Sequence, residues 1–537
     1  MNLRYRISIS SLVLLAFSNC KTRQFNANSN TKESAASDNI TKGHVSREHD
    51  QFFYENEPLD GGGFSEHPIH AELRKSCQFE SQGPKLKFDS YDVIFTNPQC
   101  NTYKFKKNIK SASGKDLLGP PQNVFCTFDD FKQKPDGSYP QFPAQNKLVE
   151  WINDSNTKEV FMSYFSFSNG SVTDALCKAV KERNVKVKIV MDVQQSDEKV
   201  QKLMTDACKP TDASATPMIL KGGHEGGIEY AHNKVTIINP NTPKVKIAFS
   251  SGNMSAGPTL HHENWHFIAL GLDTYFAQDH MCLMNAILNA RSSKAQYSES
   301  IKNCRANIKA QRESDISSFF ITSESEFETE QSNLGGQTSK KVKKVRFAGD
   351  TDCANESLYS WLKKSESIDI AAHRFSHRAL SGTLRYLKSK PKTRVVADDD
   401  LWWAGQGNPV GDNTADEFNI LQNLMNNGAK AKFMQTNDES HLLHHNKYFI
   451  FNTKNAAQDA VWAGAGNLTN QAFENNLENF YFIRIPAVIE AFRKQYNMVW
   501  NTLATAPEDM PAAHVAGTEI SSTVAPAVPP SNSPAGQ

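Results

Sequence analysis

The stretches His232-Asn-Lys-Val-Thr-Ile-Ile238 and His445-Asn-Lys-Tyr-Phe-Ile-Phe451 carry the same short phrase, His-Asn-Lys, at the head of an apolar run. Each run is short and rich in β-branched or aromatic residues, which is typical of a buried strand. A single His-Asn-Lys is usually an accident of surface composition. Two copies in matching surroundings predict one active site that is built from two half-sites.

The sequence after each copy repeats as well. Each strand is followed by a glycine-asparagine step and then by a glutamate next to an asparagine. In the first half these are Gly252-Asn253 and Glu263-Asn264, and in the second half Gly466-Asn467 and Glu478-Asn479. The repeat therefore extends well beyond the histidine motif.

Helical and strand-like segments alternate before each motif. The first half predicts helices over 146–152 and 173–183, and strands over 159–165 and 185–192. The second half predicts helices over 356–364 and 380–388, and strands over 368–372, 393–397 and 428–433. Helices over 275–288 and 487–500 close the two halves. This alternation predicts the α/β class, as two repeated α-β-α sandwich domains.

Composition sets broad limits on the protein. A chain of 537 residues is too long for one ordinary core, and 39% hydrophobic and 22% charged residues are typical of a globular protein. The net charge of +1 argues against a polybasic nucleic-acid scaffold, although a local basic groove is compatible with it.

The N-terminus predicts export. Arg4 and Arg6 precede an apolar run over 7–17, which is typical of a secretory signal and too short to span a bilayer. The run ends at Phe17-Ser-Asn-Cys20, which resembles a bacterial lipoprotein cleavage box, so we expect lipidation of Cys20. Ordinary secretion, with Cys20 unmodified or removed, is the alternative. The expected location is the bacterial cell envelope, at the periplasm or outer surface, or the medium.

The remaining cysteines form an even set, which in an exported chain allows as many as four disulfides. An isolated buried thiol is an alternative for Cys177. Since none lies beyond Cys353, we expect the second half to hold together by packing alone. No cysteine or histidine spacing suggests zinc, and we expect no metal or cofactor. The eight are Cys77, Cys100, Cys126, Cys177, Cys208, Cys282, Cys304 and Cys353.

The sequence predicts seven segments. Two repeated domains, 140–291 and 345–502, carry the motifs, and a polar linker or insertion, 292–344, separates them. The Lys-rich run over 340–344 is expected to be a solvated part of that linker. The other predicted segments are a signal (1–20), a flexible tether (21–72), a Cys-bearing extension packed on the first domain (73–139) and a disordered tail (503–537).

The repeated His-x-Lys strand, the glycine-asparagine step and the later Glu-Asn resemble the phospholipase D superfamily. The likeness covers roughly residues 140–290 and 345–502, and it is clearest over 464–479. It implies two domains of phospholipase D type that meet across a pseudo-two-fold axis. It also implies that His232 is the nucleophile and His445 the general acid/base.

The chemistry explains the pairing of these residue types. A histidine nucleophile divides phosphodiester cleavage into two easier displacements, and a second histidine protonates the leaving alcohol and activates the incoming one. Lysines and asparagines can stabilise the phosphate oxygens without a metal. A carboxylate on each histidine fixes its tautomer. The candidates for the last two roles are Lys234, Lys447, Asn253 and Asn467 at the phosphate, and Glu263 and Glu478 at the histidines.

Which glutamate orients which histidine stays open. So does the effect of Asn239 and Asn452, which stand where the usual motif has aspartate, and of Ala465, which replaces a serine. The tyrosyl-DNA phosphodiesterases of the same superfamily also lack the aspartate.

Several nearby residues have a structural reading that competes with a functional one. His441 and His444 are expected to line the pocket or face solvent, and His261 and His262 receive no role. For three tryptophans, core packing or a half-exposed loop is favoured over a place at the substrate cleft. For three aspartates, a solvated turn is at least as good an interpretation as an active-site role. These six residues are Trp265, Trp402, Trp403, Asp398, Asp399 and Asp400.

The leading functional hypothesis is a phospholipase D-type phosphodiesterase that hydrolyses or transfers phosphodiesters of phospholipids through a phosphohistidine, with the lipid anchor holding it at a membrane surface. Because both half-sites lie on one chain, a monomer suffices for catalysis. The alternatives are a secreted nuclease of the same superfamily, for which nucleic acid is the partner, and an inactive phosphate-binding surface protein.

Overall fold

A computed structural model describes most of the two predicted domains. The described residues are 58–59, 63–64, 69–79, 82–97, 109–117, 143–255, 257–259, 261–334, 337–386, 391–405, 414–436 and 443–510. The predicted signal with Cys20, most of the predicted tether, Cys100, Cys126, His441 and residues 511–537 lie outside them.

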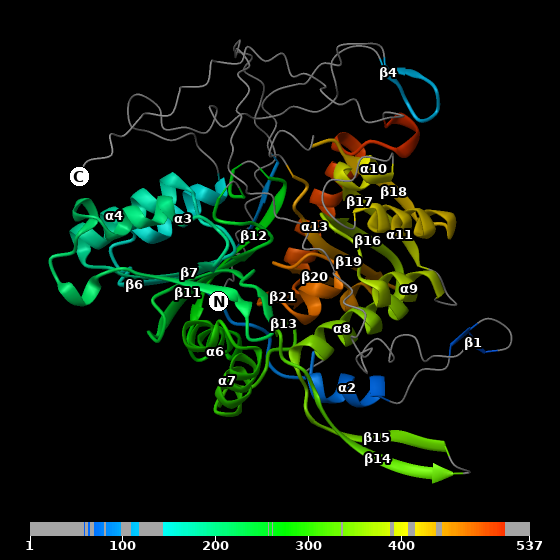
Figure 1. Cartoon of the computed structure of the whole chain (residues 1–537), viewed down its shortest axis with the longest axis horizontal. Helices are drawn as coiled ribbons and strands as arrows, with labels where there is room; N and C mark the ends of the chain where they lie inside the picture. Colours follow the sequence, from blue (N-terminus) through cyan, green and yellow to red (C-terminus); the bar gives the residue numbers. More distant parts are fainter. Residues whose placement is uncertain are drawn as a thin grey trace, which may run out of the picture.

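The first half folds around a mixed sheet of eight strands in the order β3-β12-β11-β10-β6-β7-β8-β9 (Figure 1). Its parallel part is β6 to β8, and β10, β11, β12 and β3 are added to it in antiparallel pairs. The bounds are β3 (Ser90–Thr96), β6 (Glu159–Tyr164), β7 (Lys186–Asp192), β8 (Met218–Glu225), β9 (Ile228–Tyr230), β10 (Lys234–Ile238), β11 (Lys244–Ser250) and β12 (Glu263–Gly271).

The second half repeats this arrangement with seven strands in the order β13-β21-β20-β19-β16-β17-β18. Here too the three strands at one side are parallel and the rest antiparallel. The bounds are β13 (Ile316–Ile321), β16 (Ser365–Ala372), β17 (Lys392–Asp398), β18 (Lys430–Met434), β19 (Lys447–Thr453), β20 (Ala460–Gly464) and β21 (Glu478–Ile483). The strand that follows each His-Asn-Lys, β10 or β19, lies at the middle of its sheet, where every backbone group is paired on both sides.

Helices cover both faces of each sheet, as the sequence predicts. The largest core joins one face of each sheet through α6 (Tyr275–Ala290) and α13 (Pro486–Met498). The outer face of the first sheet packs on α3 (Pro143–Asn153) and α4 (Gly170–Arg183). The outer face of the second packs on α8 (Asp350–Lys364), α9 (Arg378–Tyr386), α10 (Asp399–Gly405) and α11 (Thr414–Asn426). The two sandwiches therefore share one central layer.

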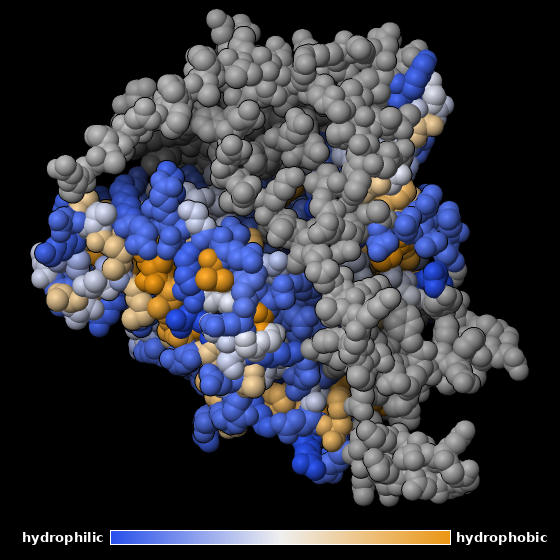
Figure 2. Space-filling view, viewed as in Figure 1, coloured by the Kyte–Doolittle hydropathy of each residue, from blue (hydrophilic) through white to orange (hydrophobic). Residues whose placement is uncertain are grey.

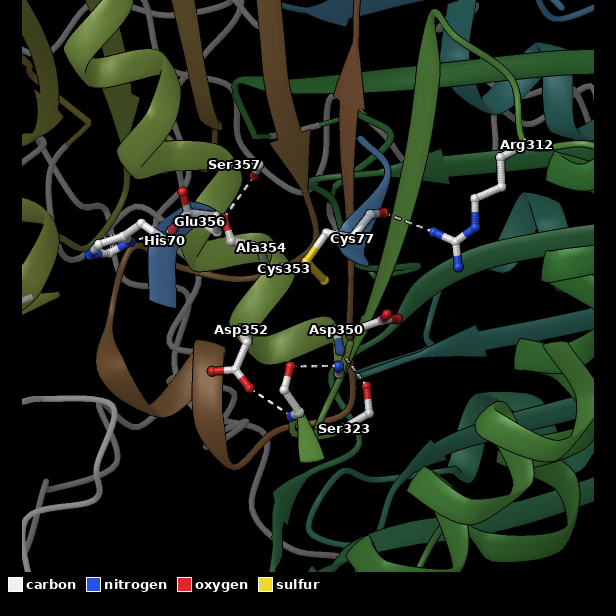
Figure 3. The surroundings of a disulfide bond; sticks show 12 residues. His70, Cys77, Arg312, Ser323, Asp350, Asp352, Cys353, Ala354, Glu356 and Ser357 are labelled. Carbon is white, nitrogen blue, oxygen red and sulfur yellow. Dashed lines mark hydrogen bonds and ion pairs between the residues drawn. A yellow bond between two sulfur atoms is a disulfide. The ribbon is translucent and has the colours of Figure 1, made fainter. Parts of the chain in front are cut away.

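The N-terminal extension is divided between the halves, rather than packed on the first alone. Strand β3 joins the first sheet as its edge strand, next to β12. Helix α2 (Ile69–Cys77) begins before the predicted boundary at residue 73 and lies against α8 of the second half (Figure 3). There Arg74 Nη1 donates to Glu356 Oε1 at 2.9 Å, and His70 contacts the same carboxylate. The extension thus ties the two halves together.

Three disulfides lie within the described residues. Cys177–Cys208 and Cys282–Cys304 close short loops in the first half. Cys77–Cys353 joins α2 to α8 across 276 residues of sequence (Figure 3). Two expectations are therefore wrong: Cys177 is not an isolated thiol, and the second half is not held by packing alone.

The segment expected to be a polar linker, 292–344, contains regular structure. It holds α7 (Lys294–Ala306) and β13, which forms the edge of the second sheet, and then β14 (Glu326–Leu334) and β15 (Gln337–Phe347), which form a projecting hairpin (Figure 1). The Lys-rich run lies on β15. The first residues of the expected disordered tail are also placed, because Thr505 pairs with Phe433 of β18. Edge strands recruited from outside the repeat explain both differences.

The face of the molecule shown in Figure 2 is mainly hydrophilic, with small hydrophobic patches scattered over it. The large hydrophobic side chains with the greatest exposure are Val193, Met204 and Met218. Over the part of the chain that the structure describes, no helix is long and apolar enough to cross a membrane.

Candidate active site

The two His-Asn-Lys motifs are buried at the entry to the two central strands. His232 and Lys234 lead into β10, and His445 and Lys447 lead into β19. His232 is 5% exposed and the other three are completely buried. Because side chains alternate along a strand, the histidine and lysine of each motif lie on the same face.

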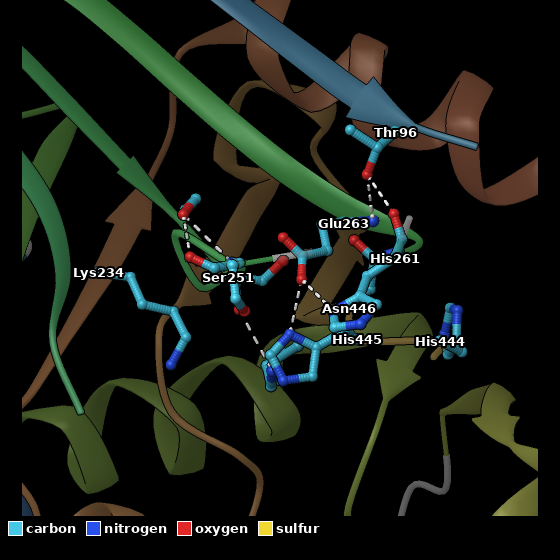
Figure 4. Close-up of polar contacts among 12 residues, drawn as sticks. Thr96, Lys234, Ser251, His261, Glu263, His444, His445 and Asn446 are labelled. Atoms are coloured by element: carbon cyan, nitrogen blue, oxygen red, sulfur yellow. Dashed lines mark hydrogen bonds and ion pairs between the residues drawn. The ribbon is translucent and has the colours of Figure 1, made fainter. Parts of the chain in front are cut away.

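Each histidine is paired with a glutamate from the other half. His232 Nδ1 lies 2.8 Å from Glu478 Oε1, and His445 Nδ1 lies 2.8 Å from Glu263 Oε1 (Figure 4 shows the second pair). The question that the sequence leaves open is answered by this geometry: the acids are exchanged between the halves. Since Nδ1 faces a carboxylate in both rings, it carries the proton, and Nε2 is left to react.

Further hydrogen bonds cross between the halves around these pairs. The Lys234 backbone N–H donates to Asn479 Oδ1 at 2.8 Å, and Asn264 Nδ2 donates to Asn446 Oδ1 at 3.0 Å. In the backbone, His232 N donates to Leu477 O at 3.0 Å. The asparagine that follows each catalytic glutamate thus joins the two half-sites.

The glycine-asparagine step is required by the position of the glutamates. A Cβ atom at Gly252 would lie 1.4 Å from Glu263 Oε2, and one at Gly466 would lie 3.0 Å from Glu478 Cδ and 2.3 Å from Phe480 Cζ. No larger residue fits at Gly252 unless the carboxylate moves. The glycine of each Gly-Asn step therefore has a steric cause.

The lysines and asparagines surround the same site. Lys234 Nζ lies 2.9 Å from His232 Nε2, and Lys447 Nζ donates to Ser251 O of the first half at 3.3 Å. Asn253 is buried and Asn467 half-buried, each just after its glycine. Within the described residues Asn467 Oδ1 has no hydrogen-bond partner. The histidines, glutamates and lysines singled out from the sequence therefore meet at the junction of the halves, and Asn253 and Asn467 follow the glycines that lie beside the glutamates.

Glu263 is ionised in spite of its burial. Burial raises its pKa, but hydrogen bonds from His261 and His445 outweigh that effect and lower the pKa to about 2. The neighbouring His262 is neutral near pH 7, because burial lowers its pKa to about 4. Burial also lowers the pKa of His444. The site therefore combines an ionised glutamate with two neutral histidines.

His261 is the functional candidate that the sequence reasoning missed. Its Nδ1 lies 3.2 Å from the same Glu263 oxygen that pairs with His445 (Figure 4). The available signal was its position two residues before Glu263, which in a strand places both side chains on one face.

The neighbouring residues fall mostly into structural roles. The reading of Asp398, Asp399 and Asp400 as a solvated turn is wrong, because all three are buried. Asp398 accepts the backbone N–H of His444, and burial together with the other two carboxyls raises its pKa. Trp265, Trp402 and Trp403 lie in the core, as favoured.

The departures from the usual motif lie at the far end of the central strands. Asn239 and Asn452 are seven residues beyond His232 and His445, about 23 Å along an extended chain. Asn239 Oδ1 accepts the Lys158 N–H at 2.7 Å, and Asn452 Oδ1 accepts from Arg493 Nε at 2.9 Å. Both asparagines act in the scaffold, remote from the histidines.

Two groups among the described residues place ligand atoms within 4.8 Å of one another, as a metal site requires: His261, Glu263 and His445, and the three aspartates. In the first group Glu263 Oε1 already receives both imidazoles. Glu263 Oε2 has no hydrogen-bond partner among the described residues.

The family model described as "Cardiolipin synthase, PLD-like domain" matches residues 358–500. No significant match is found among curated protein sequences.

Several solved structures are similar in part. Phosphatidylserine synthase of Haemophilus influenzae Rd KW20 is 11% identical, with 68% of this chain and 85% of that chain covered and a TM-score of 0.44. Yeast tyrosyl-DNA phosphodiesterase is 12% identical over 63% and 86% of the two chains, with a TM-score of 0.37. Nuc of Salmonella typhimurium, a phospholipase D family member, is 18% identical over 28% and 89%, with a TM-score of 0.23. These low scores decide nothing about the substrate.

The family match covers the second half, and the first half repeats its strand order and its His-x-Lys, Gly-Asn and Glu-Asn elements. Residues 358–500 of the chain therefore match a phospholipase D-like domain, and the first half carries the same sequence elements.

Proposed function

We propose that the protein is a phosphodiesterase that forms a phosphohistidine on His232 and uses His445 as general acid and base. The match of residues 358–500 to a phospholipase D-like domain supports phosphodiester-transferring chemistry in general. The observation that carries the proposal is the crossed pairing of His232 with Glu478 and of His445 with Glu263. It leaves two imidazole Nε2 atoms, each oriented by a carboxylate, in one composite site.

In the first step His232 Nε2 attacks phosphorus, so that an N–P bond forms as the P–O bond to the leaving alcohol breaks. His445 gives its Nε2 proton to the departing oxygen. In the second step His445 takes a proton from water or an acceptor alcohol, whose oxygen attacks phosphorus and releases His232. Water gives hydrolysis, and an alcohol gives transfer.

The other site residues stabilise the charge that develops on the non-bridging oxygens. Lys234 and Lys447 bring two cations into a buried site, where electrostatic interactions are stronger than in water. Asn253 and Asn467 supply amide donors beside them. The contact between Lys234 Nζ and His232 Nε2 also places the cation where the transferred phosphate will be bound.

We take phospholipids as the substrate class. The matched family model is described by a phospholipid-synthesising activity, and the predicted anchor at Cys20 would hold the site close to lipid. Export and lipidation are part of this proposal. Wild-type protein that enters the detergent phase of cells labelled with palmitate, and a Cys20→Ser variant that does not, would support them.

The test is head-group release from vesicles of phosphatidylglycerol, phosphatidylethanolamine or phosphatidylcholine by purified protein. Release that is abolished in His232→Ala, with a ³²P-labelled phosphohistidine trapped in wild-type protein, would support the proposal. Asn239→Asp is the matched control, because it lies far from the site and should leave turnover unchanged.

Cleavage of DNA without head-group release would overturn the substrate assignment in favour of a nuclease. Protein that turns over neither substrate and forms no phosphohistidine would overturn the enzyme and leave a phosphate-binding role.

A further inference from the structure

The two half-sites are not equivalent at their carboxylates. Glu263 receives two imidazoles on one oxygen: His445 Nδ1 at 2.8 Å and His261 Nδ1 at 3.2 Å (Figure 4). His261 is 7% exposed, so its ring is held inside the protein with the other two groups. A buried carboxylate is therefore shared between the proposed general acid and a third histidine.

The corresponding position in the other half is an amide. Asn476 precedes Glu478 by two residues, as His261 precedes Glu263, and its Nδ2 donates to Glu478 Oε1 at 3.0 Å. Because both glutamates begin corresponding strands, β12 and β21, the two neighbours occupy corresponding places. Glu478, which pairs with His232, is thus supported by the neutral amide of Asn476. Glu263, which pairs with His445, is supported instead by an imidazole, a group that can carry charge.

A second pair of positions differs in the same direction. Phe165, just after β6, contacts the ring of His232 edge to face, with centroids 5.1 Å apart. His373, just after β16, has its ring centroid 4.9 Å from that of His445. His445 consequently lies among imidazoles, whereas His232 lies against a hydrocarbon ring.

The position of His261 is fixed by the N-terminal extension. Thr96, the last residue of β3, donates its hydroxyl to His261 O and accepts the Glu263 N–H at 2.9 Å (Figure 4). The backbone on both sides of His262 is therefore clamped, and His261 and Glu263 point to the same side.

We infer that His261 is a positioning residue that divides the charge of Glu263 between two imidazoles, and thereby makes His445 the readier proton donor. The inference rests on the proposed function and gives a physical basis for the unequal roles of the two histidines. His232 has the full charge of Glu478 behind it, which favours the positive phosphohistidine. Glu263, which pairs with His445, already stabilises the proton-bearing ring of His261. His445 therefore releases its own proton more easily.

Other ionisable groups surround the cluster and belong in its charge balance. They come from the segment before β12, from the strand-leading segment 443–447, from β6 and from the end of β16. These groups are His262, His444, Lys447, Tyr164 and His373. Burial lowers the pKa of His262 and of His444 and so holds both rings neutral.

The test converts one half-site into the other. His261→Asn gives Glu263 the same neutral donor that Glu478 has, and kcat is measured against pH with a phosphodiester that has a poor leaving group. Turnover needs a protonated His445, so kcat falls as pH rises through the pKa of His445. Without the imidazole of His261 on Glu263 Oε1, more of the carboxylate charge faces His445 and raises the pKa of His445, so the falling limb should move to higher pH by ~1 unit.

The rising limb, which reports on free His232, should not move, and KM should stay constant because His261 does not contact substrate. With p-nitrophenol as leaving group, which needs little protonation, the effect on kcat should largely disappear. His262→Asn is the matched control: it removes the adjacent histidine, whose Nδ1 lies 3.5 Å from Asn97 Oδ1 and which burial keeps neutral, and it should leave both limbs in place. His261→Gln is used in the same way if His261→Asn does not fold.

A falling limb that stays in place in a folded His261→Asn or His261→Gln protein would overturn the inference, as would an equal shift in His262→Asn. Failure of the proposed function is distinguishable, because it would show in the wild-type protein as the absence of turnover and of a phosphohistidine on His232.

Discussion

The two halves of the molecule share one strand order but obtain their edge strands from different places. The first sheet is completed by β3, which comes from before the repeat, and the second by β13, which comes from the segment between the halves. Each edge strand pairs with the strand that begins with the catalytic glutamate, at Thr96↔Glu263 and Ile321↔Glu478. The difference teaches that the backbone frame of the site is duplicated, while the residues that support it are specific to each half.

The crossed acids offer the strongest test of this comparison. Glu478→Gln should reduce kcat by about 10³-fold or more with any leaving group, since it impairs the tautomer and the charge of the nucleophile His232. Glu263→Gln should be as severe with an alkyl leaving group. The loss of rate in Glu263→Gln should be much smaller for the first burst of p-nitrophenol release, because that step needs no general acid. Burst kinetics with the two substrates measure this, and equal losses for both variants would contradict the assigned roles.

The long-range disulfide at the second half and the short-range disulfide in the first half should contribute unequally to the free energy of unfolding. Removal of Cys77–Cys353 with a Cys77→Ser/Cys353→Ser variant should cost about 5 kcal/mol, because a long loop gains the most entropy when it opens. Removal of Cys177–Cys208, which spans 31 residues, should cost about 1–2 kcal/mol less by the same chain-entropy argument. Urea unfolding measures both, and activity below the transition should be unchanged. A smaller loss from the long loop than from the short one would contradict this account.

The two glycines should respond unequally to a methyl group. In Gly252→Ala the new Cβ would overlap Glu263 Oε2, so the acid of His445 is displaced and kcat should fall about 10²-fold. In Gly466→Ala the nearest atom is Phe480 Cζ, and the ring of Phe480 can turn away before Glu478 must move. Its larger effect should be on the melting temperature. Measurement of kcat and of the melting temperature for both variants tests this. A larger loss of kcat in Gly466→Ala than in Gly252→Ala would contradict it.

The smallest expected effect concerns the residue before each glycine. Ser251 Oγ accepts the Asn264 N–H at 3.1 Å, and Ala465 has no hydroxyl for the corresponding bond. Ser251→Ala should therefore cost about 1–3 kcal/mol of stability, because a buried N–H loses its partner. Ala465→Ser should change stability by about 1 kcal/mol or less. Urea midpoints of the two variants measure both, and a larger effect at Ala465 would count against the comparison.

The central part of the fold could be predicted because its signals are local. The apolar runs after His232 and His445 and the helices on either side of them have periodicities that are visible within a short window. The fold repeats, so each half also supported the reading of the other. The eight site residues followed from the same repetition.

The rest depended on contacts between distant parts of the chain. Strands β3 and β13 are edge strands in polar surroundings, and only their partners β12 and β21 define them. Burial of Asp398 could not be predicted, because the groups that satisfy it, Thr436 and the His444 N–H, lie about 40 residues away. The same is true of the crossed acids and of Cys77–Cys353: symmetry predicts that each histidine has an acid, but it does not say from which half.

Because each histidine takes its acid from the other half, the proposed catalysis depends on correct docking of the two halves. A half that folds alone, or docks in a shifted register, holds a histidine without its carboxylate and a carboxylate without its histidine. On the proposed mechanism, neither fragment would cleave a phosphodiester during synthesis, however well its own sheet had formed. The chain would become active only when both halves are correctly assembled.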